Sequence, residues 1–419
     1  MILVAVDMMR GGGSESGRAW DWAFALSRWF RLHVVTSPSV VARCRHEPAA
    51  AGWTWHTTVA RTPRSTGWRY YWEYVRWGME VPRTVRRVIA ATGACHLHHI
   101  TLGSFRFLPR YDRCGIPYSL GPLAGGEFTP RALLGEARLP AGPWLGELVR
   151  PAINRGFTCL AGARAVARSS ELALATSLDS ERILRSMGAR RTVVVFPDRV
   201  PPDLDQRNAM DTGRRVADLR RRVRLVWSGR AVWWKGGQLA IELLRRLLAA
   251  GVDAELTFFT QGSALPEWRR LVSAAGVSGR CRINGLVPHA ELHAALGKAH
   301  VFVYPTLHDS SCPALLEAYA LGLPSLTVGL GGPAMVATPE TGFNLRPTGL
   351  DAWIDGAVAC IHGWQLAPES WLRASEAARA RAGNFGGEYL DELVERVLVA
   401  PFRRKWVSES GEAGTGVAK

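Results

Sequence analysis

Two acidic residues in the last third of the chain, Asp309 and Glu317, stand eight positions apart in the segment "YPTLHDSSCPALLEAYALGLP". Pro313 occupies a favoured first helical position, and a glycine and a proline close the pattern, so the spacing predicts a helix over about residues 313–321. The helix N-terminus would offer backbone N–H groups and a positive dipole end to an anion such as a diphosphate. The two carboxylates flanking that site could then accept hydrogen bonds from the hydroxyls of a sugar and of a ribose.

Two cations are predicted at the same edge. Arg230 and Lys235 lie in "SGRAVWWKGG", which directly follows a strand pattern. An arginine can hold a phosphate through two parallel hydrogen bonds, and a lysine acts as a point charge. Either one alone is typical of a solvated surface; together with the two acids they suggest a site for a phosphorylated ligand.

The elements that must position these residues form two series. A chain of 419 residues with 47% hydrophobic content is long for one core, so we expect two domains. Strands and helices alternate from residue 2 to about 197 and again from about 224. The predicted strands of the first series are "ILVAVD", "LHVVTS", "CHLHHI", "PYSLG", "LALATS" and "TVVVFP", and those of the second are "RLVWSG", "ELTFF", "CRING", "VFVY" and "SLTV". This predicts two Rossmann-like, doubly wound parallel sheets that face a cleft, where loops at the carboxyl ends of the strands bind ligands. The predicted parts are a first domain over 1–200, a linker over 201–222, a second domain over 223–385, a C-terminal helix over 386–404 that packs back toward the first domain, and a disordered tail over 405–419.

The composition indicates the cellular compartment of the protein more clearly than it identifies a ligand. The formal net charge of +16 favours an anionic partner, although a solvated basic surface explains it equally well. Seven cysteines without a C-x-x-C pair favour reduced thiols in a cytoplasm. No apolar run is long enough to cross a membrane, so we expect a cytoplasmic protein that is at most peripheral. The stretch "WRYYWEYVRW" over 68–77 could dock on a membrane surface or stack on an acceptor, but it suits core packing better.

With these motifs in view, the sequence resembles the retaining, GT-B-fold nucleotide-sugar glycosyltransferases of glycosyltransferase family 4, whose hallmark is two acids separated by seven residues. The segments that carry the resemblance lie between residues 11 and 343 and are densest from 225 onward. They are "GGG", "HHITLGS", "GPLAGGE", "SGRAVWWKG", "INGLVPHAEL", "VFVYPTLHDSSCPALLEAYALGLP", "LGGP" and "ETGF".

The resemblance implies a role for each matching position. The first domain would bind the acceptor and the second the nucleotide sugar. Arg230 and Lys235 would contact the donor diphosphate, Glu317 the ribose and Asp309 the transferred sugar. Neither a metal nor a cofactor is implied beyond the donor as co-substrate. The further donor-binding positions are Gly11, Gly12, Gly13, Asn284, Gly285, Leu286, Ser310, Ser311, Cys312, Pro313 and Ala314.

The chain departs from the family pattern around the first acid. That acid is usually Glu and here is Asp309, and Ser310, Ser311 and Cys312 replace the usual glycine-aromatic-glycine. We interpret this as altered sugar recognition, which leaves the identity of the donor sugar open.

Three histidines occur in "ACHLHHITLGS". The family keeps a histidine at the end of this strand, where it orients a hydroxyl of the donor sugar. Because side chains alternate along a strand, only one of His98 and His99 can face a ligand. We favour His99 as catalytic and keep His98 as donor-binding. A metal site made of His96, His98 and His99 is disfavoured because no nearby acid, and no cysteine other than Cys95, completes it.

The resulting hypothesis is a hexosyltransferase that acts with retention of configuration. It would move a hexose or N-acetylhexosamine from a UDP-linked donor to an acceptor hydroxyl, in natural-product or glycoconjugate biosynthesis. The alternatives are a pseudo-glycosyltransferase or phosphorylase of the same fold, and a non-catalytic basic protein that binds membrane or nucleic acid. We do not expect nucleic acid as a partner.

Overall fold

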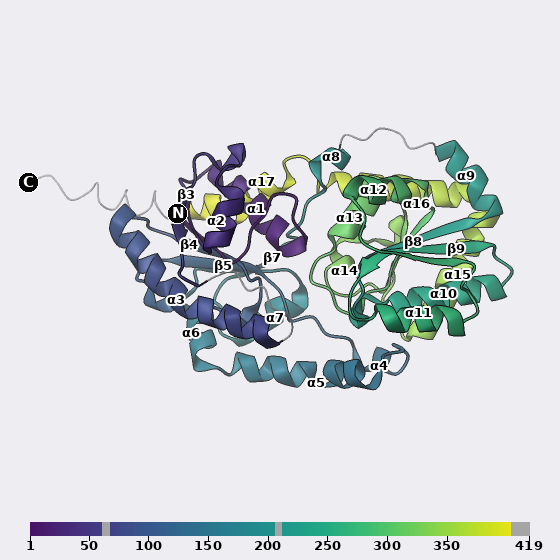
Figure 1. Cartoon of the computed structure of the whole chain (residues 1–419), viewed down its shortest axis with the longest axis horizontal. Coiled ribbons are helices and arrows are strands. Elements are labelled where there is room, and N and C mark those ends of the chain that lie inside the picture. The colour runs from purple at the N-terminus through teal and green to yellow at the C-terminus, as the bar shows by residue number, and fades with distance from the viewer. Residues whose placement is uncertain (61–67, 206–211, 404–419) are drawn as a thin grey trace, which may run out of the picture. The chain divides into compact units, whose positions relative to one another are not determined.

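The computed structural model describes residues 1–60, 68–205 and 212–403. The predicted disordered tail over 405–419 lies outside these residues. The chain divides into two compact units, each described by itself below (Figure 1). Unit 1 consists of Met1–Gly126, Arg155–Pro197 and Glu388–Lys419, and unit 2 of Glu127–Asn154 and Asp198–Gly387.

Unit 1 is built on a seven-stranded sheet whose strands all pair in parallel. The order is β3-β2-β1-β4-β5-β6-β7. Six of the strands were predicted; the edge strand β3 was not, because its residues are half-buried or exposed and form no apolar run. The strands are β1 (Ile2–Ala5), β2 (His33–Thr36), β3 (Thr54–Thr57), β4 (Leu97–Thr101), β5 (Tyr118–Leu123), β6 (Leu172–Ala175) and β7 (Thr192–Val194).

Helices cover both faces of this sheet. Ile2 and Val4 of β1 pack into one buried cluster with residues of α3, whereas Leu3 and Ala5 pack into another with α1 and α17. Helix α17 comes from the far end of the chain and lies against α1 (Figure 1). The helices are α1 (Ser14–Ser27), α2 (Pro38–Cys44), α3 (Trp68–Thr92), α6 (Ala161–Ser169), α7 (Leu178–Ser186) and α17 (Tyr389–Val394), which continues as a π-helical turn over Glu395–Val399.

The aromatic stretch at the start of α3 is divided between core and surface. Tyr74 and Trp77 are fully buried, and Trp77 donates a hydrogen bond from Nε1 to Thr58 Oγ1 at 3.1 Å. Tyr71 and Trp72 remain exposed. Core packing therefore explains one face of this helix.

Unit 2 contains a six-stranded sheet, again with every strand pair parallel. The order is β10-β9-β8-β11-β12-β13. Five strands were predicted, and the two-residue edge strand β13 is too short for a sequence pattern. The strands are β8 (Val223–Arg230), β9 (Ala254–Gln261), β10 (Cys281–Asn284), β11 (Val301–Tyr304), β12 (Ser325–Thr327) and β13 (Gly342–Phe343).

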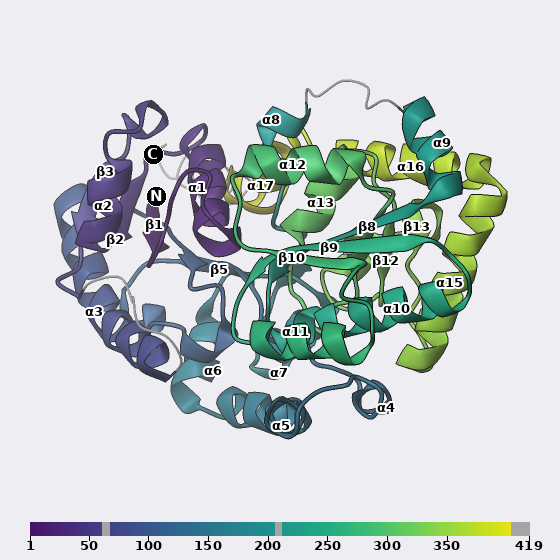
Figure 2. The ribbon, with the colours of Figure 1, turned by 45° about the vertical axis from the view of Figure 1, so that its right-hand side comes forward.

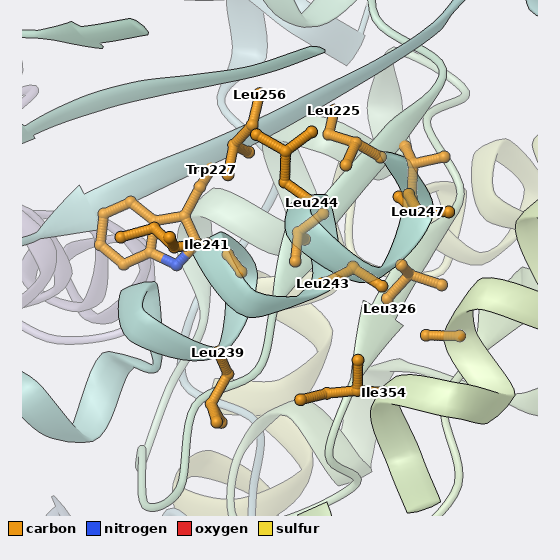
Figure 3. Packing of buried hydrophobic residues seen from close by; sticks show 14 of the residues in the cluster. Leu225, Trp227, Leu239, Ile241, Leu243, Leu244, Leu247, Leu256, Leu326 and Ile354 are labelled. Atoms are coloured by element: carbon orange, nitrogen blue, oxygen red, sulfur yellow. The ribbon is translucent and has the colours of Figure 1, made fainter. Parts of the chain in front are cut away.

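The core of unit 2 lies between this sheet and its helices. Leu243, Leu244 and Leu247 of α10 belong to one buried cluster with Leu225 and Leu256 of the strands (Figure 3). Helices α10 and α11 lie on one side of β8–β10, and α12 and α13 on the other (Figure 2). The helices are α10 (Gly237–Ala249), α11 (Leu265–Ala274), α12 (His289–Lys298), α13 (Pro313–Ala320), α14 (Pro333–Val336), α15 (Leu350–Leu366) and α16 (Pro368–Gly383).

The stretch predicted as a linker over 201–222 is partly helical and belongs to unit 2. It contains α8 (Pro202–Asp205) and α9 (Thr212–Arg221). Arg215 of α9 is buried, donates to the carbonyl of Ala299 at 2.7 and 3.0 Å, and stacks on Trp371 at 4.8 Å. An arginine at the buried position of a helix gives no apolar periodicity, which is why the sequence resembled a linker.

Residues 127–154 also fall in unit 2, although the sequence placed them in the domain over 1–200. They hold α4 (Arg131–Leu134) and most of α5 (Ala141–Thr158). Hydrogen bonds tie the segment to the rest of unit 2: Gln238 Nε2 donates to the carbonyl of Ala137 at 3.1 Å, and the Asp351 amide donates to Glu136 at 2.8 Å. Among the helices of the described ranges, none has the length and apolar character that crossing a membrane requires.

Candidate active site

The candidate residues of unit 2 collect at the carboxyl edge of its sheet. Strands β8 and β11 are parallel neighbours, so the loops that follow them leave from the same edge. The loop after β8 carries Arg230 and Lys235, and the loop after β11 carries Asp309 and leads into α13.

Lys235, Tyr304 and Asp309 form a closed triangle of contacts. The ammonium group of Lys235 donates to Tyr304 Oη at 2.7 Å and pairs with Asp309 Oδ2, and the tyrosine hydroxyl donates to that same oxygen at 2.7 Å. Burial raises the pKa of Tyr304 well above its usual value, so the hydroxyl stays a donor. Both contacts use Oδ2, and Oδ1 of Asp309 has no hydrogen bond with any described residue. A carboxylate held in this way keeps one oxygen for a ligand.

A glycine fixes the position of Lys235. Gly236 adopts a left-handed conformation (φ +74°), and a Cβ there would lie 2.1 Å from the carbonyl oxygen of Pro305. The loops are joined by further hydrogen bonds, in which the Leu307 amide and Thr306 Oγ1 both donate to the carbonyl of Trp234. The chain turn that starts α10 is thereby packed directly on the loop that carries Asp309.

The "GLGGP" segment supports the Asp309 loop from the next strand. The Gly332 amide donates to the Asp309 carbonyl at 2.6 Å, and a Cβ on Gly331 would lie 2.1 Å from the same oxygen. The structure gives this segment a positioning role.

Arg230 and the stretch 284–286 are open to solvent. The Arg230 side chain makes no hydrogen bond or ion pair with the described residues, although it ends the central strand β8. Asn284 ends β10, and Leu286 is exposed to 68% of its surface. A Cβ on Gly285 would meet nothing within 4 Å. These groups are free to contact a ligand at this edge.

Helix α13 begins at Pro313, as the sequence predicted, and Cys312 is its N-cap. Ser311 and Cys312 are buried, whereas Ser310, Pro313 and Ala314 are half-buried. Burial raises the pKa of the Cys312 thiol well above its usual value, so this cysteine is not poised as a thiolate nucleophile. Access to the helix terminus is therefore through its backbone and the half-buried residues.

Glu317 lies one turn inside α13 and faces α12. Its Oε2 is 3.6 Å from Nε2 of His293, and the Glu317 side chain is only 12% exposed. Asp309 and Glu317 thus have separate partners, which suits two carboxylates that contact different parts of one ligand.

Sequence reasoning missed several groups beside these residues. Tyr304, the last residue of β11, was seen only as part of a strand. The ring of His308 stacks on that of Trp234, with 5.2 Å between the ring centroids and an angle of 18° between the ring planes. Its Nδ1 lies 3.0 Å from Glu147 Oε2. Burial lowers the pKa of His308. Tyr304 could have been predicted as a site residue from the sequence, because it directly precedes the loop that carries Asp309. Glu147 could not, because it is distant in sequence from every predicted site residue.

The predicted glycines of unit 1 form the loop between β1 and α1. Gly13 is the N-cap of α1, and a Cβ on Gly12 would meet Ser16 Oγ at 2.6 Å. Gly11 has φ +61° and, like Gly13, has open space where a Cβ would be. The loop is partly exposed, as a ligand-binding loop requires.

His98 and His99 point to opposite faces of the unit 1 sheet, as predicted, and both are fully buried. His98 Nδ1 lies 2.8 Å from Ser119 Oγ, and its ring stacks on Trp22. His99 Nε2 donates to the carbonyl of Leu102 at 3.0 Å, which leaves Nδ1 to accept from Tyr111 Oη at 2.7 Å. Both ring nitrogens of His99 are therefore occupied. Its predicted contact with a donor sugar stays a prediction that these bonds do not favour.

Burial also determines the charge of these histidines. It lowers the pKa of His98 to about 3 and that of His99 to about 4. Both imidazoles are neutral at pH 7, in keeping with hydrogen-bonded core groups.

A known protein family matches part of the second unit. Residues 222–362 match the family model "Glycosyl transferases group 1". The chain is 25% identical over 202 residues to the 2-deoxystreptamine glucosyltransferase of Streptomyces kanamyceticus, covering 44% of this chain and 51% of that protein. It is 32% identical over 142 residues to the GDP-mannose-dependent alpha-mannosyltransferase of Mycolicibacterium smegmatis, covering 32% and 36%. The aligned regions therefore span about half or less of these relatives.

Solved structures match nearly the whole chain. The sucrose-phosphate synthase of Thermosynechococcus elongatus superimposes with a TM-score of 0.68 at 15% identity, over 96% of this chain and 99% of that one. Anabaena HepE in complex with UDP gives 0.62 at 13% identity, over 95% and 99%. The predicted GT-B fold and the resemblance to its glycosyltransferases are confirmed at the level of fold and of the matched domain.

Proposed function

We propose that this chain is a retaining glycosyltransferase that transfers a hexose or N-acetylhexosamine from a nucleoside diphosphate sugar to an acceptor hydroxyl. The observation that carries the proposal is the triangle of Lys235, Tyr304 and Asp309, which joins the predicted phosphate-binding cation to the predicted sugar-binding acid. The match of residues 222–362 to a glycosyltransferase family supports it.

Charge builds up on the diphosphate as the bond to the anomeric carbon breaks. Lys235, held in place by two neighbours, and the exposed Arg230 would stabilise that charge together with the N-terminal N–H groups of α13. Preorganisation matters here, because a cation already fixed in position needs no rearrangement during the reaction.

Asp309 would act on the sugar through its unoccupied Oδ1, which can accept a hydrogen bond from a sugar hydroxyl. Its Oδ2 would keep Lys235 extended toward the phosphates. Because the carboxylate is paired with an ammonium group and a phenol, it is better suited to recognition than to nucleophilic attack. Retention would then arise by front-side attack with the leaving phosphate accepting the proton of the acceptor, the mechanism that the family resemblance implies.

We propose UDP as the nucleotide, since a similar fold binds it in HepE. A small polyhydroxylated acceptor in natural-product biosynthesis is the acceptor class that best matches the relatives, among them enzymes named for 2-deoxystreptamine. Glu317 would bind the ribose and the 284–286 stretch the base.

The test incubates the protein with a panel of nucleotide sugars, beginning with UDP-N-acetylglucosamine. The two readouts are release of the nucleoside diphosphate and the thermal shift of the protein. Stabilisation by one donor, with release that increases when an aminocyclitol is added, is the expected result. Release of inorganic phosphate from a sugar phosphate instead would identify a phosphorylase. The absence of any stabilisation across the panel would contradict the proposal.

A further inference from the structure

Two histidines of unit 2, which have no role in the proposed reaction, converge with Glu317, the proposed ribose-binding glutamate. His289 and His293 are four residues apart on α12, so they lie on the same side of that helix. Glu317 approaches them from α13. One ligand atom from each of the three residues lies within 4.8 Å of the other two.

His293 is the most telling member of this cluster. It is 3% exposed, and neither ring nitrogen makes a hydrogen bond with a described residue. A buried imidazole without hydrogen-bond partners is destabilising, because its nitrogens lose their hydrogen bonds to water and gain none within the protein. Its Nε2 instead lies 3.6 Å from Glu317 Oε2. Two ligands of one tetrahedral zinc ion are separated by about 3.3–3.5 Å, so this pair needs only a small movement to share a metal.

The other nitrogen of His293 also faces a carboxylate. Nδ1 is 3.8 Å from Asp203 Oδ2 of α8. Histidines that bind metals commonly donate their second N–H to a carboxylate, which fixes the tautomer and strengthens the ligand. The order Asp203, His293, metal, Glu317 reproduces that arrangement with residues from three helices.

We propose that His289, His293 and Glu317 bind Zn²⁺, with Asp203 as the residue that orients His293. Two imidazoles and a carboxylate form a ligand set that zinc accepts, and it leaves a fourth position open. The exposed His289 provides the approach from solvent. The sequence alone did not predict the site, because Glu317 lies in a different segment from the two histidines. Only the four-residue spacing of His289 and His293 can be read from the sequence.

Zinc bound here would compete with the sugar donor. This second step rests on the proposed function, in which Glu317 binds the donor ribose. A Glu317 carboxylate that coordinates zinc through Oε2 keeps only Oε1 for the ribose hydroxyls, so it should bind them more weakly than the metal-free carboxylate does. Free zinc would then act as a reversible inhibitor that raises the KM for the donor and leaves kcat unchanged.

The experiment measures zinc binding by the full chain without any donor, by titrating zinc chloride against a chromophoric chelator. Cys95→Ser and Cys159→Ser are included in every protein, because these two thiols are exposed. The expected result is one zinc per chain, lost in His289→Ala and retained in His362→Ala, an exposed histidine elsewhere in unit 2. Asp203→Asn should weaken binding about 10- to 100-fold.

Equal zinc binding by the protein that keeps all three proposed ligands and by its His289→Ala variant, or no binding by either, would overturn the site. Donor competition is then measured in the same proteins. A zinc-dependent rise in KM that disappears in His289→Ala supports the competition. Simultaneous binding of zinc and UDP, with the site intact, overturns it. Zinc binding by a protein that binds no nucleotide supports the metal site while contradicting the proposed function.

Discussion

Residues able to do chemistry occur in two regions of this molecule, and the structure treats them in opposite ways. At the carboxyl edge of the unit 2 sheet, Lys235 and Asp309 are partly accessible and paired with each other, and Arg230 is exposed. In β4 of unit 1, His98 and His99 are fully buried. The first arrangement can exchange its partners for a ligand; the second has hydrogen bonds that belong to the core.

The comparison is sharpest for two tyrosines. Tyr304 and Tyr111 are both buried, both have their pKa raised well above the usual value by burial, and each hydrogen-bonds a predicted catalytic residue. Tyr304 bonds a carboxylate that keeps a free oxygen, whereas Tyr111 completes the hydrogen bonds of His99. The same residue type therefore supports a site in one unit and a core in the other.

The largest expected effect is on the cation of unit 2. Lys235→Ala should lower turnover about 100-fold or more, because it removes a preorganised charge from the leaving diphosphate. Lys298→Ala, at an exposed position on α12, is the matched control. The measurement is steady-state kinetics beside thermal unfolding. Equal turnover in the two variants would remove Lys235 from the mechanism.

The second effect concerns the glycine that positions this lysine. Gly236→Ala should cost more than about 2 kcal/mol of unfolding free energy, because a left-handed residue gains a Cβ that overlaps Pro305. Gly251→Ala is the control: its φ is also positive (+80°), but its Cβ would meet nothing within 4 Å. That variant should lose only about 1–2 kcal/mol. Denaturant unfolding compares them, and similar losses would show that the packing against Pro305 is unimportant.

The third effect separates the two tyrosines. Tyr304→Phe should lower turnover about tenfold, because it removes a hydrogen bond to a charged group at the site. Tyr111→Phe should cost about 1–3 kcal/mol of stability and leave kcat unchanged, because His99 Nδ1 loses its buried donor. A fall in kcat for Tyr111→Phe without destabilisation would restore His99 to the catalytic site.

A fourth effect is a dependence of stability on pH. His98 and His99 have folded pKa values of about 3 and about 4, below the ordinary 6.5. At a pH between each folded value and 6.5, the unfolded chain binds a proton that the folded chain does not. The contribution of these histidines to stability is therefore fully present above pH 6.5 and is lost as the pH falls below it. Each histidine contributes a slope of about 1.4 kcal/mol per pH unit. Unfolding curves at pH 7.5 and 5 should show this, and His99→Gln should reduce the difference; an unchanged difference would contradict the neutral, buried state of His99.

The sequence by itself determined the fold class and the local order of the site. The alternation of apolar strands and amphipathic helices located eleven strands of the two parallel sheets, because buried parallel strands form dense apolar runs. It missed β3 and β13, which are edge strands with little apolar burial. The start of α13 at Pro313 and the cations after β8 followed from short-range rules of helix capping and of sheet topology.

Only the tertiary structure decided which of these groups meet. The bonds from Lys235 to Tyr304 and to Asp309 join two segments that are about seventy positions apart. Helix α9 was hidden because its buried face uses Arg215, and the segment 127–154 joined unit 2 through hydrogen bonds that no local pattern encodes. Burial of His98 and His99, and the convergence of His293 with Glu317, are likewise set by packing between distant elements. Sequence patterns report which residues lie on one face of one element, and chemistry depends on which faces are brought together.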